Sequence, residues 1–122
     1  VVLVLHLKRF LHGGSRRGIL RRRKLDTCVT FPSQGLDLGK TGCLGREFPH
    51  GTNTSYDLVG VSNHMCNLHG GHYTADCLCG QDWVRFNDSN VSRGSRKFDG
   101  SSAYLLFYEQ QQRDSGGEGR SE

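Results

Sequence analysis

The chain of 122 residues lacks several features that mark common protein classes. It has only 2 prolines and 1 tryptophan, and no segment repeats another. Its 5 cysteines form no Cys-x-x-Cys pair, the arrangement that holds structural zinc, so we expect no metal or other cofactor. No apolar run reaches the ~20 residues that a membrane-spanning helix needs, so we expect no membrane partner.

The cysteine count also bears on the cellular compartment. An odd number of cysteines without an N-terminal signal peptide argues against a secreted disulfide scaffold. A reducing compartment is favoured, and we expect the protein to be cytoplasmic, nuclear or both. An apolar content of 34% with 17 glycines allows one domain at most, with a thin core.

Most of the net charge of +4 comes from arginines in an exposed connection over residues 11–23. Clustered arginines can neutralise phosphates of RNA or DNA. No aromatic residues are interleaved with these arginines to stack on bases, so we do not expect nucleic acid as a partner. A solvated hairpin tip is the interpretation we favour.

Residue patterns predict strands and no helix. Strands are expected over residues 1–10, 56–63, 72–79 and 83–86, with a weak strand over 25–31 that Pro32 ends. Residues 39–55 and 64–71 are expected to be loops. Residues 110–122 are polar and rich in glycine, which predicts a disordered tail after a domain over residues 1–109.

Two of these strands form a predicted hairpin. Gly80 and Gln81 can close a two-residue turn with glycine first. In that register Asn87 lies diagonally across from His72, on the same face and within side-chain reach. A one-residue change in the turn would bring Asp88 to His72 instead. Both orienting partners therefore remain open.

The alternation of residues 72–79 divides this strand into two faces. The face of His72 also carries Thr74, Asp76 and Leu78, and the other carries Tyr73, Ala75, Cys77 and Cys79. The second face is apolar, so Cys77 and Cys79 are expected to be small buried side chains rather than reactive thiolates. Cys66, in the loop before His72, is the cysteine expected to lie nearest to it.

A histidine held by an amide or a carboxylate is the base half of a nucleophilic site. The partner fixes the tautomer and leaves one ring nitrogen free to take a proton. Gly70 and Gly71 suit a place where a substrate backbone must come close. The alternative is a loop histidine beside a glycine turn, without a chemical role.

Four segments, in order, carry a resemblance to the ubiquitin-specific proteases, the cysteine proteases that remove ubiquitin. The match runs over residues 1–109. The segments are LVLHLKRF (3–10); KLDT (24–27) with FP (31–32) and LDL (36–38); YDLVGVSNH (56–64) leading to GGHYTA (70–75); and WVRFNDSNV (83–91) closing with AYLLFY (103–108).

The resemblance implies an α+β papain-like cysteine protease, of which this chain is the mainly antiparallel β half that carries the base. It implies that His72 is the general base and that Asn87 holds the third catalytic position, where many members carry aspartate. Asp88 is a possible helper. Gly70, Gly71 and Tyr73 would line the channel for the ubiquitin tail, and ubiquitin and ubiquitinated proteins would be partners.

The family's nucleophile lies in an Asn-Thr-Cys motif that is absent from these residues. The chain is therefore expected to be a fragment, inactive alone, whose further partner is the N-terminal part of the same catalytic domain. The alternative is a catalytically inactive ubiquitin-binding or scaffolding product.

Overall fold

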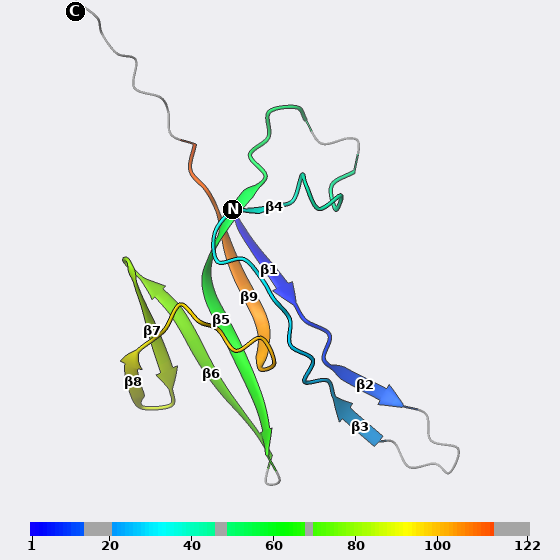
Figure 1. Ribbon diagram of the computed structural model, residues 1–122, viewed down its shortest axis with the longest axis vertical. Helices are drawn as coiled ribbons and strands as arrows, with labels where there is room; N and C mark the ends of the chain where they lie inside the picture. Colours follow the sequence, from blue (N-terminus) through cyan, green and yellow to red (C-terminus); the bar gives the residue numbers. More distant parts are fainter. Residues whose placement is uncertain (14–20, 46–48, 68–69, 114–122) are drawn as a thin grey trace, which may run out of the picture.

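A computed structural model describes residues 1–13, 21–45, 49–67 and 70–113, and within these ranges the chain forms strands and no helix (Figure 1). No helix of membrane-spanning length and hydropathy occurs in this part of the chain. The strands are β1 (Val2–His6), β2 (Phe10–Gly13), β3 (Arg21–Lys24), β4 (Leu36–Asp37), β5 (Ser55–Asn67), β6 (Gly70–Cys79), β7 (Asp82–Asn87), β8 (Asn90–Arg93) and β9 (Ala103–Gln110).

Seven strands form one antiparallel sheet in the order β1-β9-β5-β6-β7-β8, with the short β4 also pairing β5. The first and last strands of the chain are thus neighbours, with Val2 opposite Glu109. Strands β5 to β8 follow one another as hairpins, and β9 returns to the centre of the sheet between β1 and β5. Strands β2 and β3 form a separate two-stranded ribbon.

The predicted strands over 56–63, 72–79 and 83–86 are confirmed as parts of β5, β6 and β7. The loop predicted over 64–71 is wrong for residues 64–67 and 70–71, because β5 and β6 continue to pair there, with His64 opposite Tyr73 and Cys66 opposite Gly71, and residues 68–69 lie outside the described residues. Strand β8, which returns after Asp88 and Ser89, was not predicted. The last residues of the predicted tail, 114–122, and residues 14–20 of the basic connection lie outside the described residues.

One face of the large sheet carries the buried core. Its members come from the central strands and the β7 hairpin: Tyr56, Leu58, Val61, Trp83, Ala103, Leu106 and Tyr108. The irregular segments after β3 and after β8 cover this face and add Phe31 and Phe98. The hydroxyl of the fully buried Tyr108 donates to the Pro32 carbonyl at 2.7 Å, and burial raises the pKa of that hydroxyl to about 12.

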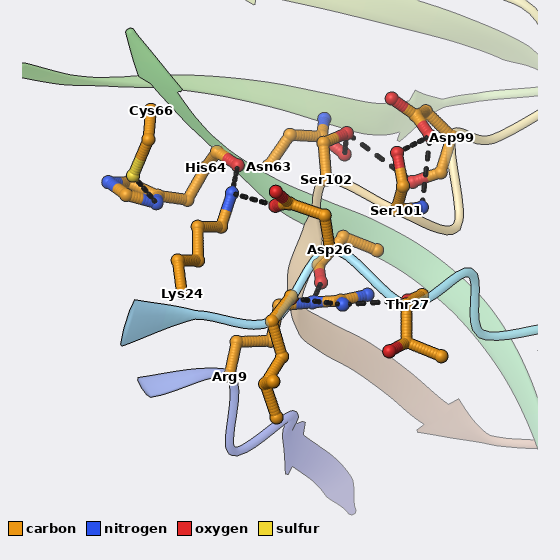
Figure 2. Close-up of polar contacts among 12 residues, drawn as sticks. Arg9, Lys24, Asp26, Thr27, Asn63, His64, Cys66, Asp99, Ser101 and Ser102 are labelled. Carbon is orange, nitrogen blue, oxygen red and sulfur yellow. Dashed lines mark hydrogen bonds and ion pairs between the residues drawn. The ribbon is translucent and has the colours of Figure 1, made fainter. Parts of the chain in front are cut away.

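A buried cation, Arg9, joins three segments of the chain (Figure 2). Arg9 is 3% exposed and donates to four backbone carbonyls, those of Ala103 (2.6 Å), Gly100 (2.5 Å), Leu25 (2.9 Å) and Thr27 (2.8 Å). These bonds explain why the strand predicted over 25–31 is wrong. Two backbone carbonyls of this segment, those of Leu25 and Thr27, accept hydrogen bonds from the Arg9 side chain and are not available for strand pairing.

The Arg9 contacts predict a strict requirement for a guanidinium. Lysine keeps the charge but has a single nitrogen, which cannot reach all four carbonyls. We expect Arg9→Lys to lower the free energy of unfolding by about 3 kcal/mol. Urea unfolding measures the loss, and the exposed Arg23→Lys is the matched control, expected to change stability by less than about 0.5 kcal/mol. Equal stabilities for the two variants would contradict this role.

Candidate active site

The β6–β7 hairpin has the predicted register. Cys79 pairs with Asp82 and Ala75 with Phe86, and the turn between the strands is Gly80-Gln81. Gly80 has a φ of 65°, a left-handed conformation that glycine adopts without a steric penalty. The two-residue turn therefore sets which residues of β7 share a face with His72.

His72 and Asn87 meet beyond the last regular pair of this hairpin. The Nε2 atom of His72 lies 2.6 Å from Oδ1 of Asn87. Because an amide oxygen only accepts hydrogen bonds, the proton is on Nε2 and the lone pair is on Nδ1. The half-buried imidazole thus has a fixed tautomer, and within the described residues no hydrogen bond occupies its Nδ1 lone pair, as a general base requires.

Asp88 takes a different position from Asn87. It lies in the turn between β7 and β8 with a φ of 50°, a conformation that Asp and Asn tolerate better than most residues. Its side chain is exposed and makes no hydrogen bond to any residue that the structure describes. The turn conformation by itself accounts for an aspartate at this position.

A buried polar network lies on the same face as His72, one pair further along the hairpin. Asp76 is 1% exposed and accepts from Arg85 on β7 at 2.8 and 3.0 Å and from Asn63 on β5 at 2.8 Å. Asn63 also contacts Thr74 at 3.3 Å. Three strands are thereby joined by side chains immediately next to the His72–Asn87 pair.

This network corrects the expectation for the two faces of β6. The face of His72 is the more buried one, although Thr74 and Asp76 are polar, because their hydrogen bonds are satisfied inside the sheet. On the other face, Cys77 is half-buried and Cys79 is exposed rather than buried. Burial, followed by the nearby Cys79 and Asp76, raises the pKa of the Cys77 thiol.

The network predicts that Arg85 is needed for stability. Arg85→Leu would leave the Asp76 carboxylate buried without its cation, and we expect a loss of about 3 kcal/mol in the free energy of unfolding. Arg93→Leu, on the exposed strand β8, is the control and should cost less than about 0.5 kcal/mol. If the two variants unfold at the same urea concentration, the Asp76–Arg85 pair does not stabilise the hairpin.

The two positions before His72 favour glycine for different structural reasons. Gly70 has a φ of 133°, which side chains rarely adopt. A Cβ on Gly71 would lie 2.5 Å from Nε2 of His64, so the absence of a side chain lets the His64 ring lie against β6. Both glycines are exposed, and open space surrounds the position of a Cβ on Gly70.

The structure reveals a ring cluster that the sequence analysis missed. The His64 ring lies 4.6 Å from that of Tyr73 and 5.5 Å from that of Phe10, and Tyr104 lies within 6.4 Å of all three. Tyr73 is 55% and Phe10 is 38% exposed, so the ring cluster forms a surface. The pairing of His64 with Tyr73 could have indicated it, had residues 64–67 been recognised as a strand.

His64 lies among charged and polar groups as well as rings (Figure 2). The Lys24 ammonium donates to the His64 carbonyl and lies 3.4 Å from Asp26, and the Cys66 thiol lies 3.8 Å from Nδ1 of His64. Burial, then the positive charge of Lys24, lowers the pKa of His64, and Asp26 partly opposes this effect. The imidazole is therefore held neutral.

This lowered pKa predicts a loss of stability in acid. Below roughly pH 6.5 the unfolded chain binds a proton at His64 more readily than the folded chain does. The free energy of unfolding therefore decreases as the pH is lowered. His64→Phe keeps a ring but cannot titrate. We expect chemical unfolding at pH 7.5 and pH 5.5 to show a smaller loss for this variant than for the wild type. An unchanged loss would assign the acid sensitivity to other groups.

All five cysteines are free, and Cys28, Cys43, Cys66 and Cys79 are exposed. Cys66 contacts His64 rather than His72. Within the described residues no cysteine forms a hydrogen bond with His72. No thiol of the described chain is therefore placed as the nucleophile for this base.

A histidine held by an amide at one end of an antiparallel sheet is an arrangement that papain-like cysteine proteases share. Comparisons with known proteins identify the family to which this fold belongs. Residues 1–108 match the ubiquitin carboxyl-terminal hydrolase family, and the chain belongs to that family.

Individual relatives and solved structures are similar over most of the chain. Human ubiquitin carboxyl-terminal hydrolase 2 is 47% identical over 113 residues, 88% of this chain and 17% of that protein. The bovine ubiquitin carboxyl-terminal hydrolase 15 is 40% identical over 94% of this chain and 11% of its own. A chain of the SAGA DUB module bound to monoubiquitin superposes with a TM-score of 0.69 at 37% identity, covering 91% of this chain and 23% of that one. The chain therefore spans only a small part of these relatives.

Proposed function

We propose that this chain is the base-bearing part of a ubiquitin-specific cysteine protease that cleaves the bond after the C-terminal glycine of ubiquitin. The observation that carries the proposal is the 2.6 Å contact between His72 and Asn87. Membership of the ubiquitin carboxyl-terminal hydrolase family supports the same reaction. The bond cleaved would be an isopeptide bond to a lysine side chain or a peptide bond.

The proposed mechanism follows from the tautomer of His72. Nδ1 takes the proton of a cysteine thiol supplied by another part of the catalytic domain and later returns a proton to the departing amine. Asn87 accepts the hydrogen bond from Nε2–H of His72 and orients the imidazole ring while the ring is charged. As a neutral amide, Asn87 adds less electrostatic stabilisation to the imidazolium than a carboxylate would. Asp88 is a secondary candidate for that charge.

Ubiquitin is the proposed main partner, together with ubiquitinated proteins. Solved structures similar to this chain contain monoubiquitin or ubiquitin aldehyde. Gly70, Gly71 and the exposed Tyr73 are proposed to line the channel for the ubiquitin tail. The ring cluster of Phe10, His64, Tyr73 and Tyr104 would extend that wall with apolar surface.

The nucleophile would come from the N-terminal part of the same catalytic domain, since these residues contain no Asn-Thr-Cys motif. The chain by itself is then inactive. A cytoplasmic or nuclear location would suit a free-thiol enzyme of this kind. A longer product without the motif would instead be a ubiquitin-binding or scaffolding protein.

The proposal predicts the effects of three substitutions in the longer, nucleophile-containing protein. His72→Ala should abolish hydrolysis of a fluorogenic ubiquitin substrate while ubiquitin affinity, measured by calorimetry, stays within about twofold, because proton transfer is needed only for the chemistry. Asn87→Ala should reduce turnover by about 100-fold or more, and Asp88→Ala by less, because only Asn87 contacts the ring.

The outcomes separate the roles. Near-normal turnover in His72→Ala would remove His72 from the mechanism, and joint loss of binding and folding would make it structural. A larger effect of Asp88→Ala than of Asn87→Ala would reverse the assignment of the orienting group. The 122-residue chain alone is the negative control, and we expect it to show no turnover. Turnover by it that disappears in Cys66→Ala would show a different nucleophile.

A further inference from the structure

The large sheet divides at the end far from the candidate active site. Strands β5 and β6 stop pairing at Gly60 and Cys77, whereas β6 and β7 continue to pair as far as Cys79 and Asp82. The register of β5 against β9 also shifts next to this point, between Leu58 and Gly60. In Figure 1 the β6–β7 turn accordingly stands away from β5. The last residues of β6 therefore have no strand partner on the β5 side within the described part of the chain.

A cavity of about 370 Å³ occupies this division of the sheet. We call it the split cavity, and its lining includes Asp57, Leu58, Leu78, Gln81, Trp83 and Arg96. Its volume lies in the range of about 300–1,000 Å³ that ligand sites in proteins have. Leu78 lies on the same face of β6 as His72, but about 20 Å further along the strand. The split cavity is therefore separate from the candidate active site.

The buried indole of Trp83 has an unused hydrogen-bond donor. Trp83 is 7% exposed, and no residue that the structure describes accepts a hydrogen bond from its indole N–H. No buried side-chain nitrogen of the described chain lacks a partner, so this N–H is open to water rather than enclosed. A buried tryptophan usually has an acceptor for this proton. An oxygen atom of a ligand in the split cavity would supply one.

Arg96 is held at the edge of the split cavity by its neighbours in the chain. The Gly94 amide donates to the Trp83 carbonyl at 2.7 Å, and a Cβ on Gly94 would lie 2.9 Å from that carbonyl oxygen. On the other side of Arg96, the Phe98 ring lies 4.8 Å from the Trp83 ring, edge to face. The exposed Arg96 forms no ion pair with any described residue. An unneutralised guanidinium and a free indole N–H therefore line one cavity.

Asp57 provides an acceptor on the β5 side of the cavity. Its Oδ1 atom accepts from the Gly35 amide and from the Gln111 side chain, both at 2.9 Å, whereas no described residue donates to Oδ2. An occupant thus meets donors on the hairpin side and an acceptor on the β5 side. An acidic residue of an extended peptide matches both, with its carboxylate and with backbone N–H groups. A phosphate group would bring only negative oxygen atoms to the Asp57 carboxylate.

We propose that the split cavity binds an aspartate or glutamate residue of an extended partner peptide. Arg96 and the Trp83 indole N–H bind the carboxylate, and Asp57 accepts from a backbone N–H of the peptide. The unpartnered end of β6 lies along the peptide backbone, as in strand addition. Residues 93–97, RGSRK, carry three cations that attract an acidic segment. This inference does not rest on the proposed function.

Trp83 is the one tryptophan of these 122 residues, which allows a direct test by NMR. In the full-length protein labelled with ¹⁵N at the indole nitrogen, the Trp83 signal is the one that Trp83→Phe removes. We expect titration with the blocked peptide Val-Thr-Glu-Val-Thr to shift this signal to saturation. Its counterpart Val-Thr-Gln-Val-Thr should bind about 10-fold more weakly or less, because hydrogen bonds to a charged group are the stronger ones. Equal binding of the two peptides, or no saturable shift at about 5 mM peptide, would overturn the proposal.

Two neighbouring arginines separate contact in the cavity from general attraction by positive charge. Arg96→Gln should weaken binding of the glutamate peptide about 10-fold or more. Arg93→Gln removes the same charge from the exposed strand β8, outside the cavity lining, and should weaken it by about twofold or less. Equal losses would overturn the site, as would a Trp83 shift with unconjugated ubiquitin and none with the peptide. Because the titration measures binding and not turnover, its outcome is independent of whether the protein hydrolyses ubiquitin conjugates.

Discussion

A single buried guanidinium holds the frame of this structure together. Arg9 carries its charge into the core without an ion pair to any carboxylate that the structure describes, and four backbone carbonyls replace its water. One of those carbonyls, that of Gly100, also accepts from the Val29 amide at 3.0 Å, and a Cβ on Gly100 would lie 2.3 Å from the Val29 carbonyl oxygen. Charge, backbone and a missing side chain therefore fit one another next to β9, which pairs with β1 on one side and with β5 on the other.

The His72–Asn87 pair of the candidate site lies next to polar contacts inside the sheet. His72 and Asn87 lie beyond the last regular β6–β7 pair, so backbone hydrogen bonds alone do not hold them. Asp76 and Arg85 form the adjacent side-chain pair on the same face, and Asn63 links them to β5. A side-chain pair supported in this way has little freedom to move apart, a property that the proposed general base chemistry would require.

Local geometry explains what the sequence could and could not predict. The two-residue turn at Gly80 specifies the β6–β7 register, so the approach of Asn87 to His72 was predictable from neighbouring residues. The role of residues 25–27 was not, because the carbonyls of Leu25 and Thr27 accept hydrogen bonds from Arg9, more than fifteen positions away in the sequence. The burial of Asp76 also escaped pattern analysis, since hydrophobic alternation identifies apolar faces and not polar ones whose hydrogen bonds are satisfied internally.

The strand order also separates the chain into early and late stages of folding. His72 and Asn87 are 15 positions apart, whereas the Arg9 contacts with Gly100 and Ala103 join residues 91 and 94 positions apart. Short loops close at lower entropic cost and sooner than long ones. The hairpins that carry His72 and Asn87 can therefore form while β1 and β9 are still apart, and the apolar strand β9 stays exposed to aggregation until the slow closure completes the sheet.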